Sequence, residues 1–202
     1  MSTPIATNAW ANDPDGSFAA NGQSGPVWFL GGSLGDSVTR YLTIPADKAI
    51  FLPVHQWIFG ATVFDCDPSN PGVTCDVQTL KKAAAGAAKA VALMEVSIDG
   101  KTISDVKDYR VLSPDAFSVT IPDDNLPTYF GSPVPAGTYS PQVADGYYLL
   151  LAPLSVGSHT ITVHVVSTLG FEYVITYNIT VAALPAATTE EYSSRKPLAS
   201  GG

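Results

Sequence analysis

Positively charged residues are few in this chain of 202 residues: 10 Lys and Arg stand against 18 Asp and Glu, a formal net charge of −8. Proteins that bind a phosphate backbone or anionic lipid headgroups need clustered Lys and Arg. The composition therefore argues against a nucleic acid partner and against an anionic membrane surface. No hydrophobic run approaches the roughly 20 apolar residues that span a bilayer, so we expect no transmembrane segment.

Cysteine is also scarce. Cys66 and Cys75 are the only two, and the residues between them include Pro and Gly, which suit a loop that folds back on itself. We expect a disulfide between them, which would contribute about 2–3 kcal/mol by restricting the unfolded chain; a pair of free thiols is the alternative. A disulfide is typical of an oxidising compartment, so the protein is expected to be secreted and extracellular.

Histidine occurs three times, as His55, His159 and His164. His159 and His164 are an odd number of residues apart, so a regular strand would place them on opposite faces and they would not share a metal. Carboxylates offer oxygen ligands for calcium in two groups, Asp65 and Asp67 beside the cysteines, and Asp123 and Asp124 further on. Neither group has the spacing of an EF-hand loop. We expect no cofactor, with calcium as the open alternative to solvated loop acids.

Short strands and turns dominate what is present, since 16 Pro and 17 Gly are spread among Val, Thr and Tyr. Residues 26–32 and 37–45, joined by a glycine-rich turn, are predicted to form the central hairpin. In the second stretch Val38, Leu42 and Ile44 share one face, on which Arg40 is the exception. Further strands are expected at 49–59, 110–112, 117–121 and 147–151, and an antiparallel pair at 159–167 and 171–181.

Two local signals are stronger. Asp76 is placed to cap a helix over the alanine-rich residues 77–91. Asp99 and Gly100 can adopt the positive φ of a type I′ turn, which predicts a hairpin. Together these elements predict an all-β fold, a β-sandwich of jelly-roll or immunoglobulin-like type with one inserted α-helix. We expect an N-terminal arm at 1–24, the sandwich domain at 25–183, and a flexible tail at 184–202.

Residues 31–35 read G-x-S-x-G around Ser33, the pattern of a hydrolase nucleophile elbow. An elbow needs a strand, a tight turn and then a helix. The residues after Ser33 alternate as a strand, so a hairpin turn is the preferred reading. A hydrolase remains the alternative function, using Ser33, with His164 as a further candidate, or an acid pair drawn from Asp123, Asp124 and Asp145.

A long loop is expected from about 122 to 146, and long ordered loops are often functional. Its aromatic residues, with an earlier tryptophan, could stack on sugar rings while an acid binds hydroxyl groups. The candidate ligand-binding residues are Tyr129, Tyr139, Asp145 and Trp57. The alternative is that these rings pack beneath their own loop.

Several motifs occur in one order over roughly residues 22–181: GPVWFLGG at 25–32, TIPADKAIFLP at 43–53, PDDN at 122–125, PAGTY at 135–139, ADGYY at 144–148 and GSHTI at 157–161. In these motifs the chain resembles a group of uncharacterised secreted bacterial and environmental β-sandwich proteins. The resemblance implies export but supplies no catalytic residue. We therefore expect a secreted binding or assembly module with a polysaccharide or protein partner, and a homo-oligomer if the terminal arms add strands to neighbouring subunits.

Overall fold

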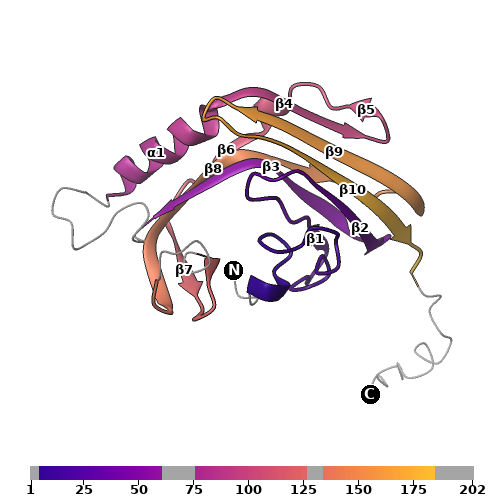
Figure 1. The fold of residues 1–202 in the computed structure, drawn as a ribbon, viewed down its shortest axis with the longest axis horizontal. Helices are drawn as coiled ribbons and strands as arrows, with labels where there is room; N and C mark the ends of the chain where they lie inside the picture. The colour runs from indigo at the N-terminus through magenta and orange to yellow at the C-terminus, as the bar shows by residue number, and fades with distance from the viewer. Residues whose placement is uncertain (1–4, 61–75, 127–133, 185–202) are drawn as a thin grey trace, which may run out of the picture.

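The structure, a computed structural model, describes residues 5–60, 76–126 and 134–184. Within them, strands form two five-stranded sheets (Figure 1). The first has the order β1-β3-β8-β6, with β7 also paired to β8: β1 (Val27–Phe29), β3 (Ala49–Gly60), β8 (Gly137–Leu151), β6 (Arg110–Leu112) and β7 (Phe117–Ile121). The second has the order β2-β10-β9-β4-β5: β2 (Val38–Pro45), β10 (Glu172–Ala182), β9 (Gly157–Ser167), β4 (Val91–Ile98) and β5 (Lys101–Thr102).

The core lies between the two sheets. Alternate residues of each strand point inward, as the period of a strand requires: in β9 these are Ile161, Val163 and Val165, and in β10 they run from Tyr173 to Val181. They pack against inward residues of β3 and β8, including Leu52 and Leu149. The prediction of an all-β sandwich with an inserted helix is confirmed, as is the antiparallel pairing of β9 with β10.

Helix α1 (Val77–Lys89) is the predicted alanine-rich helix. Asp76 caps it, since its Oδ1 accepts hydrogen bonds from the backbone N–H groups of Gln78 and Thr79, each at 3.0 Å. Leu80 and Ala84 pack against Val143 of β8 and form a small second core. The helix therefore covers the part of β3 and β8 that extends beyond the second sheet (Figure 1).

The predicted hairpin of residues 26–32 and 37–45 is wrong. β1 pairs in parallel with β3, whereas β2 pairs in parallel with β10 in the other sheet. The connection crosses between the sheets at Gly31, whose carbonyl oxygen accepts hydrogen bonds from Arg40 and from the Tyr177 hydroxyl. A Cβ at position 31 would lie 2.1 Å from the Ala9 carbonyl oxygen, so only glycine fits this crossing.

Residues 5–24, which begin with the short 3-10 helix η1 (Ile5–Thr7), fold back onto the sandwich. Asp13 is buried, and its Oδ1 accepts hydrogen bonds from the N–H groups of Gly16 and Phe18. The Asp15 carbonyl oxygen accepts from the Tyr41 N–H at 2.8 Å, so this segment covers the outer edge of β2. Arg40, the exception on the apolar face of β2, meets Asp13 here.

The predicted Asp-Gly hairpin is confirmed: Asp99 and Gly100 have φ of 51° and 75°, and β4 pairs with β5 across them. A second 3-10 helix, η2 (Val106–Tyr109), then leads to β6. Of the helices that the structure describes, none is long and apolar enough to cross a membrane.

Candidate functional site

A cavity of about 710 Å³ lies along one edge of β3. β8 pairs with β3 from Ile50 to Gly60, but β1 pairs only with Ala49–Phe51 on the opposite side. Beyond Phe51, no strand of the described ranges occupies that side, and residues 53–59 line the cavity.

The other walls come from distant parts of the chain. The N-terminal segment contributes Ile5, Asn8, Trp10 and Ala11, and the crossing between β1 and β2 contributes residues 32–36. The remaining lining residues are Val119, Ile121, Pro122, Asn125, Leu126, Gln142, Phe171, Tyr173 and Ile175. Figure 1 shows the N-terminal segment within the curve that β3 and β8 describe, so the cavity lies between that segment and the β7 region.

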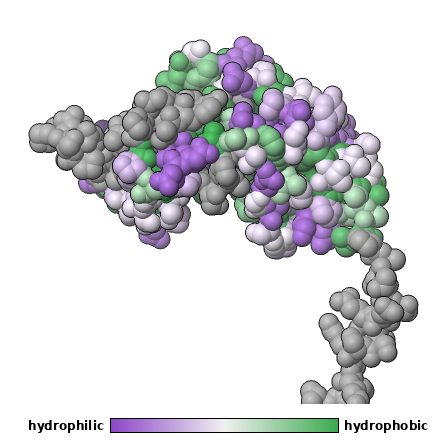
Figure 2. Space-filling model, turned by 60° about the horizontal axis from the view of Figure 1, so that its bottom comes forward, coloured by the Kyte–Doolittle hydropathy of each residue, from purple (hydrophilic) through white to green (hydrophobic). Residues whose placement is uncertain are grey.

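The lining is mainly apolar and partly aromatic. The Trp57 ring centroid is 6.1 Å from that of His55 and 6.2 Å from those of Phe59 and Phe171. On the face that Figure 2 brings forward, by contrast, hydrophobic residues form small areas separated by hydrophilic ones. A mainly apolar lining of this kind is usual for a small-molecule or peptide site.

His55 is the centre of a hydrogen-bond chain in the cavity wall. The Trp57 indole Nε1–H donates to His55 Nε2 at 3.1 Å. His55 Nδ1 lies 3.2 Å from the Tyr173 hydroxyl, which donates to the Val54 carbonyl oxygen at 2.9 Å. Since Nε2 accepts and the Tyr173 proton is used elsewhere, the network assigns the proton of neutral His55 to Nδ1.

Burial keeps His55 neutral. It lowers the pKa of His55, because the charged imidazolium would lose its hydration, and it raises the pKa of the Tyr173 hydroxyl. Both ring nitrogens of His55 are engaged, so His55 holds the Trp57 and Tyr173 side chains in place and has no free nitrogen to act as a general base. Trp57, predicted as a ligand-binding residue, does line the cavity.

Ser33 lines the same cavity, but its surroundings do not activate it. Its Oγ accepts a hydrogen bond from the Gly35 N–H at 3.3 Å, and the chain continues into β2, not into a helix. Within the described ranges, none of the hydrogen bonds of His55 involves Ser33. The strand–turn–helix arrangement of a nucleophile elbow is therefore missing.

Gln142 supplies a polar group that the apolar wall does not satisfy. Its side chain is 4% exposed, and Nε2 has no hydrogen-bond partner in the described part of the chain. The amide packs against Gly60, where a Cβ would lie 1.9 Å from Oε1. An unpaired buried donor costs about 1–3 kcal/mol, so a ligand acceptor that reached it would bind favourably.

The sequence predicted that Asp145 and Tyr139 lie in a loop, and this prediction is wrong. Both lie within β8, because pairing with β3, β6 and β7 extends this strand back to Gly137. Asp145 is fully buried and accepts two hydrogen bonds from Arg110, Nε to Oδ1 at 2.9 Å and Nη2 to Oδ2 at 2.5 Å. Arg110 therefore satisfies it, while the Tyr139 hydroxyl donates to Pro135 O at 2.7 Å. Neither residue lines the cavity.

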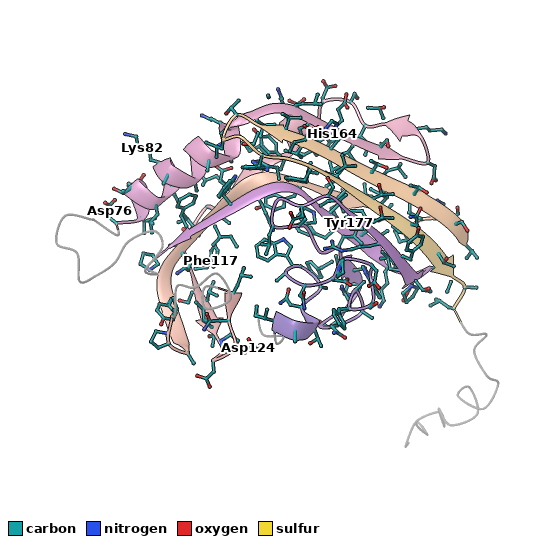
Figure 3. The ribbon with its side chains drawn as sticks, in the orientation of Figure 1. Asp76, Lys82, Phe117, Asp124, His164 and Tyr177 are labelled. Carbon is teal, nitrogen blue, oxygen red and sulfur yellow. The ribbon has the colours of Figure 1, made fainter. Side chains whose placement is uncertain are left out.

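The remaining candidates lie apart. Asp124 follows β7, and its Oδ2 accepts from the Ile5 N–H at 2.9 Å, which ties the N-terminal segment to this turn. His164 is on the outer face of β9, with Nε2 2.8 Å from Glu172 and Nδ1 3.8 Å from Glu95. Figure 3 shows Asp124 and His164 on opposite sides of the molecule. Asp145 is paired with Arg110, and none of Asp123, Asp124 and Asp145 lines the cavity.

Metal and disulfide predictions fall partly outside the structure. Asp65, Asp67, Cys66, Cys75 and Tyr129 lie outside the described residues. Within the described ranges, no three His, Cys, Asp or Glu side chains gather closely enough to hold a metal ion. Calcium and the disulfide stay predictions.

His159 and Asp99 form a pair whose stabilising effect should depend on pH. The hydrogen bond of 2.8 Å from His159 Nδ1 to Asp99 raises the pKa of His159 and lowers that of Asp99. The histidine contribution is complete below its unfolded pKa of about 6.5 and is lost as pH rises through the higher folded value; the aspartate contribution is lost as pH falls below about 4.

We therefore expect the stability difference between the native protein and His159→Gln, less than about 1 kcal/mol for so exposed a pair, to be larger at pH 5.5 than at pH 8.5. Urea unfolding at the two values measures it. An equal or larger difference at pH 8.5 would contradict this assignment.

Sequence reasoning missed most of the cavity. Trp10, Phe171 and Gln142 come from segments that only the tertiary fold brings beside Trp57, and no local pattern marks them. Comparison of the chain with models of protein families, with curated proteins and with solved structures found no match.

Proposed function

We propose that the protein is a secreted binding module that takes an apolar group of its partner into the cavity along β3. The observation that supports this most is the cavity itself, which six separate parts of the chain line, largely with aromatic and aliphatic side chains. Export is supported by the resemblance to secreted proteins and by the expected disulfide.

The lining favours an apolar group over a sugar. A sugar ring buries several hydroxyl groups, each of which needs a polar partner. In the wall the His55, Trp57 and Tyr173 polar atoms are already bonded to one another. The Gln142 amide nitrogen could meet one ligand acceptor, but a single donor does not satisfy the several hydroxyl groups of a sugar ring. We therefore favour the protein partner over the polysaccharide partner for this site.

The charge of the cavity and of the chain restricts the class of ligand further. Asp36 is the acidic residue of the lining, and no Lys or Arg of the described residues lines the cavity. The chain as a whole carries −8. A neutral or cationic ligand is favoured, since an anion would be repelled by this field. For a hydrolase, Ser33 would still need a base that its described neighbours do not provide.

The cavity can be tested by filling it. Leu34 lies in the crossing segment that lines the cavity, and Leu34→Trp replaces its side chain with a larger indole ring. This variant should bind the neutral apolar dye Nile red at least tenfold more weakly, because the added atoms occupy the space of the dye. Fluorescence titration measures the affinity. Val156→Trp is the matched control, because Val156 is exposed and precedes the end of β9 that pairs with Val181, opposite the end near Phe171; it should bind as the native chain does. Equal affinity of the two variants, or no dye binding by the native protein, would contradict the proposal.

A further inference from the structure

The backbone edge of β3 is the feature of the cavity that the proposed function leaves unused. In an antiparallel pair, every second residue of a strand turns its N–H and C=O groups away from its partner. In β3 these groups face the cavity side once β1 has ended at Phe29, opposite Phe51. Pro53 has no N–H, and the Val54 carbonyl oxygen already accepts from Tyr173. The Ala144 carbonyl oxygen, opposite Ile58, accepts from Ser113 on the far side of β8, so Ile58 and its alternate Gln56 turn their groups away from β8. The usable edge groups are therefore the N–H and C=O of Gln56 and Ile58.

An open edge is a template for another strand. Natural sheets protect such edges with proline or a bulge, and β3 has both, Pro53 and the irregularity between Pro53 and His55. These features protect the start of the open stretch but leave residues 55–59 regular in their pairing with β8. The outward groups of Gln56 and Ile58 thus lie between His55, Trp57 and Phe59, whose side chains also line the cavity.

An apolar ligand without hydrogen-bonding groups would bury these N–H and C=O groups unpaired, at about 1–3 kcal/mol each. An extended peptide would pair with them, since an added strand lies about 4.8 Å from its neighbour. Its alternating side chains would then meet the apolar walls on either side. The acidic residue Asp36 at the cavity and the net charge of −8 favour a peptide with basic ends.

We propose that the partner of this cavity is an extended, alternating apolar peptide segment with basic flanks, which adds to the sheet as a strand beside residues 55–59 of β3. This proposal rests on the proposed function and names the class of its ligand. It assigns recognition to main-chain hydrogen bonds along β3, with side-chain selection by the apolar walls.

The test uses the full chain and two hexapeptides with blocked ends. In both, valine alternates with threonine between a lysine at each end; in the second, alternate backbone nitrogens are methylated. The first peptide should displace Nile red and slow amide exchange at Gln56 and Ile58 at least tenfold, while exchange inside β9 and β10 stays unchanged. The methylated peptide should bind at least tenfold more weakly, because it lacks the donors that an added strand needs.

The outcomes separate the two proposals. If Nile red binds but the first peptide neither displaces it nor protects Gln56 and Ile58, the peptide inference is wrong and the apolar cavity stands. Equal binding of the two peptides also overturns the inference, since side chains alone would then explain it. If neither dye nor peptide binds, both proposals fail.

Discussion

Replacing Arg40 with methionine is expected to lower the free energy of unfolding by about 3–5 kcal/mol, because it leaves a buried carboxylate without its counter-charge. Arg40 and Asp13 are each 2% exposed. The guanidinium Nε donates to the Asp13 carbonyl oxygen at 2.6 Å and lies 4.0 Å from Asp13 Oδ2, while Nη1 donates to Gly31. Methionine retains most of the apolar stem but none of these donors.

Urea unfolding followed by circular dichroism measures the loss. Lys48→Met is the matched control, since Lys48 lies 3.9 Å from Asp47 at the surface and such a pair contributes at most about 1 kcal/mol. Adding Asp13→Asn to Arg40→Met should restore part of the stability by removing the orphaned charge. An exposed pair contributes at most about 1 kcal/mol. If the free energies of unfolding of Arg40→Met and of the control differ by less than about this amount, the buried pair is not what holds the N-terminal segment.

The second large effect is a difference in stability loss between substitutions of Arg110 and of its partner Asp145. Asp145 is fully buried, whereas the Arg110 side chain is 26% exposed. Arg110→Met therefore strands a buried charge and should cost about 3–5 kcal/mol. Asp145→Asn leaves an arginine that can reach water, so it should cost less, about 1–3 kcal/mol. Urea unfolding of the two variants gives the order.

The same pair of variants tests the role of Asp145. Because Asp145 does not line the cavity, folded Asp145→Asn should bind Nile red as the native chain does. A variant that kept full stability but lost binding would return Asp145 to the ligand-binding residues that the sequence suggested.

Features set by neighbouring residues could be predicted from the sequence. The Asp76 cap, the alanine-rich α1 and the Asp99–Gly100 turn depend on backbone conformations that a few residues decide. The alternation in β9 and β10 likewise gave both the strands and their pairing, because a short turn joins them. The sandwich class follows from the number and period of such strands.

Features that depend on partners far along the chain could not be predicted from the sequence. Residues 26–32 and 37–45 look like a hairpin, yet β1 and β2 enter different sheets, since the periods of two strands do not say which strands they pair with. Asp145 falls in the loop that the sequence predicts from about 122 to 146, yet it lies in β8, and Arg110, 35 residues earlier, determines its role.

Arg40 shows where the two kinds of information meet. The sequence by itself determined that a charged side chain stands on the apolar face of a strand, and a buried charge requires a partner. Only the tertiary structure decided that the partner is Asp13. The cavity has the same origin. The sequence supplied Trp57 and the strand that carries it, but the edge of β3 is open because β1 ends at Phe29, and the other walls of the cavity come from five further segments of the chain. Local pattern fixes which face of a strand is apolar, whereas chain packing decides which edges and faces are left for a ligand.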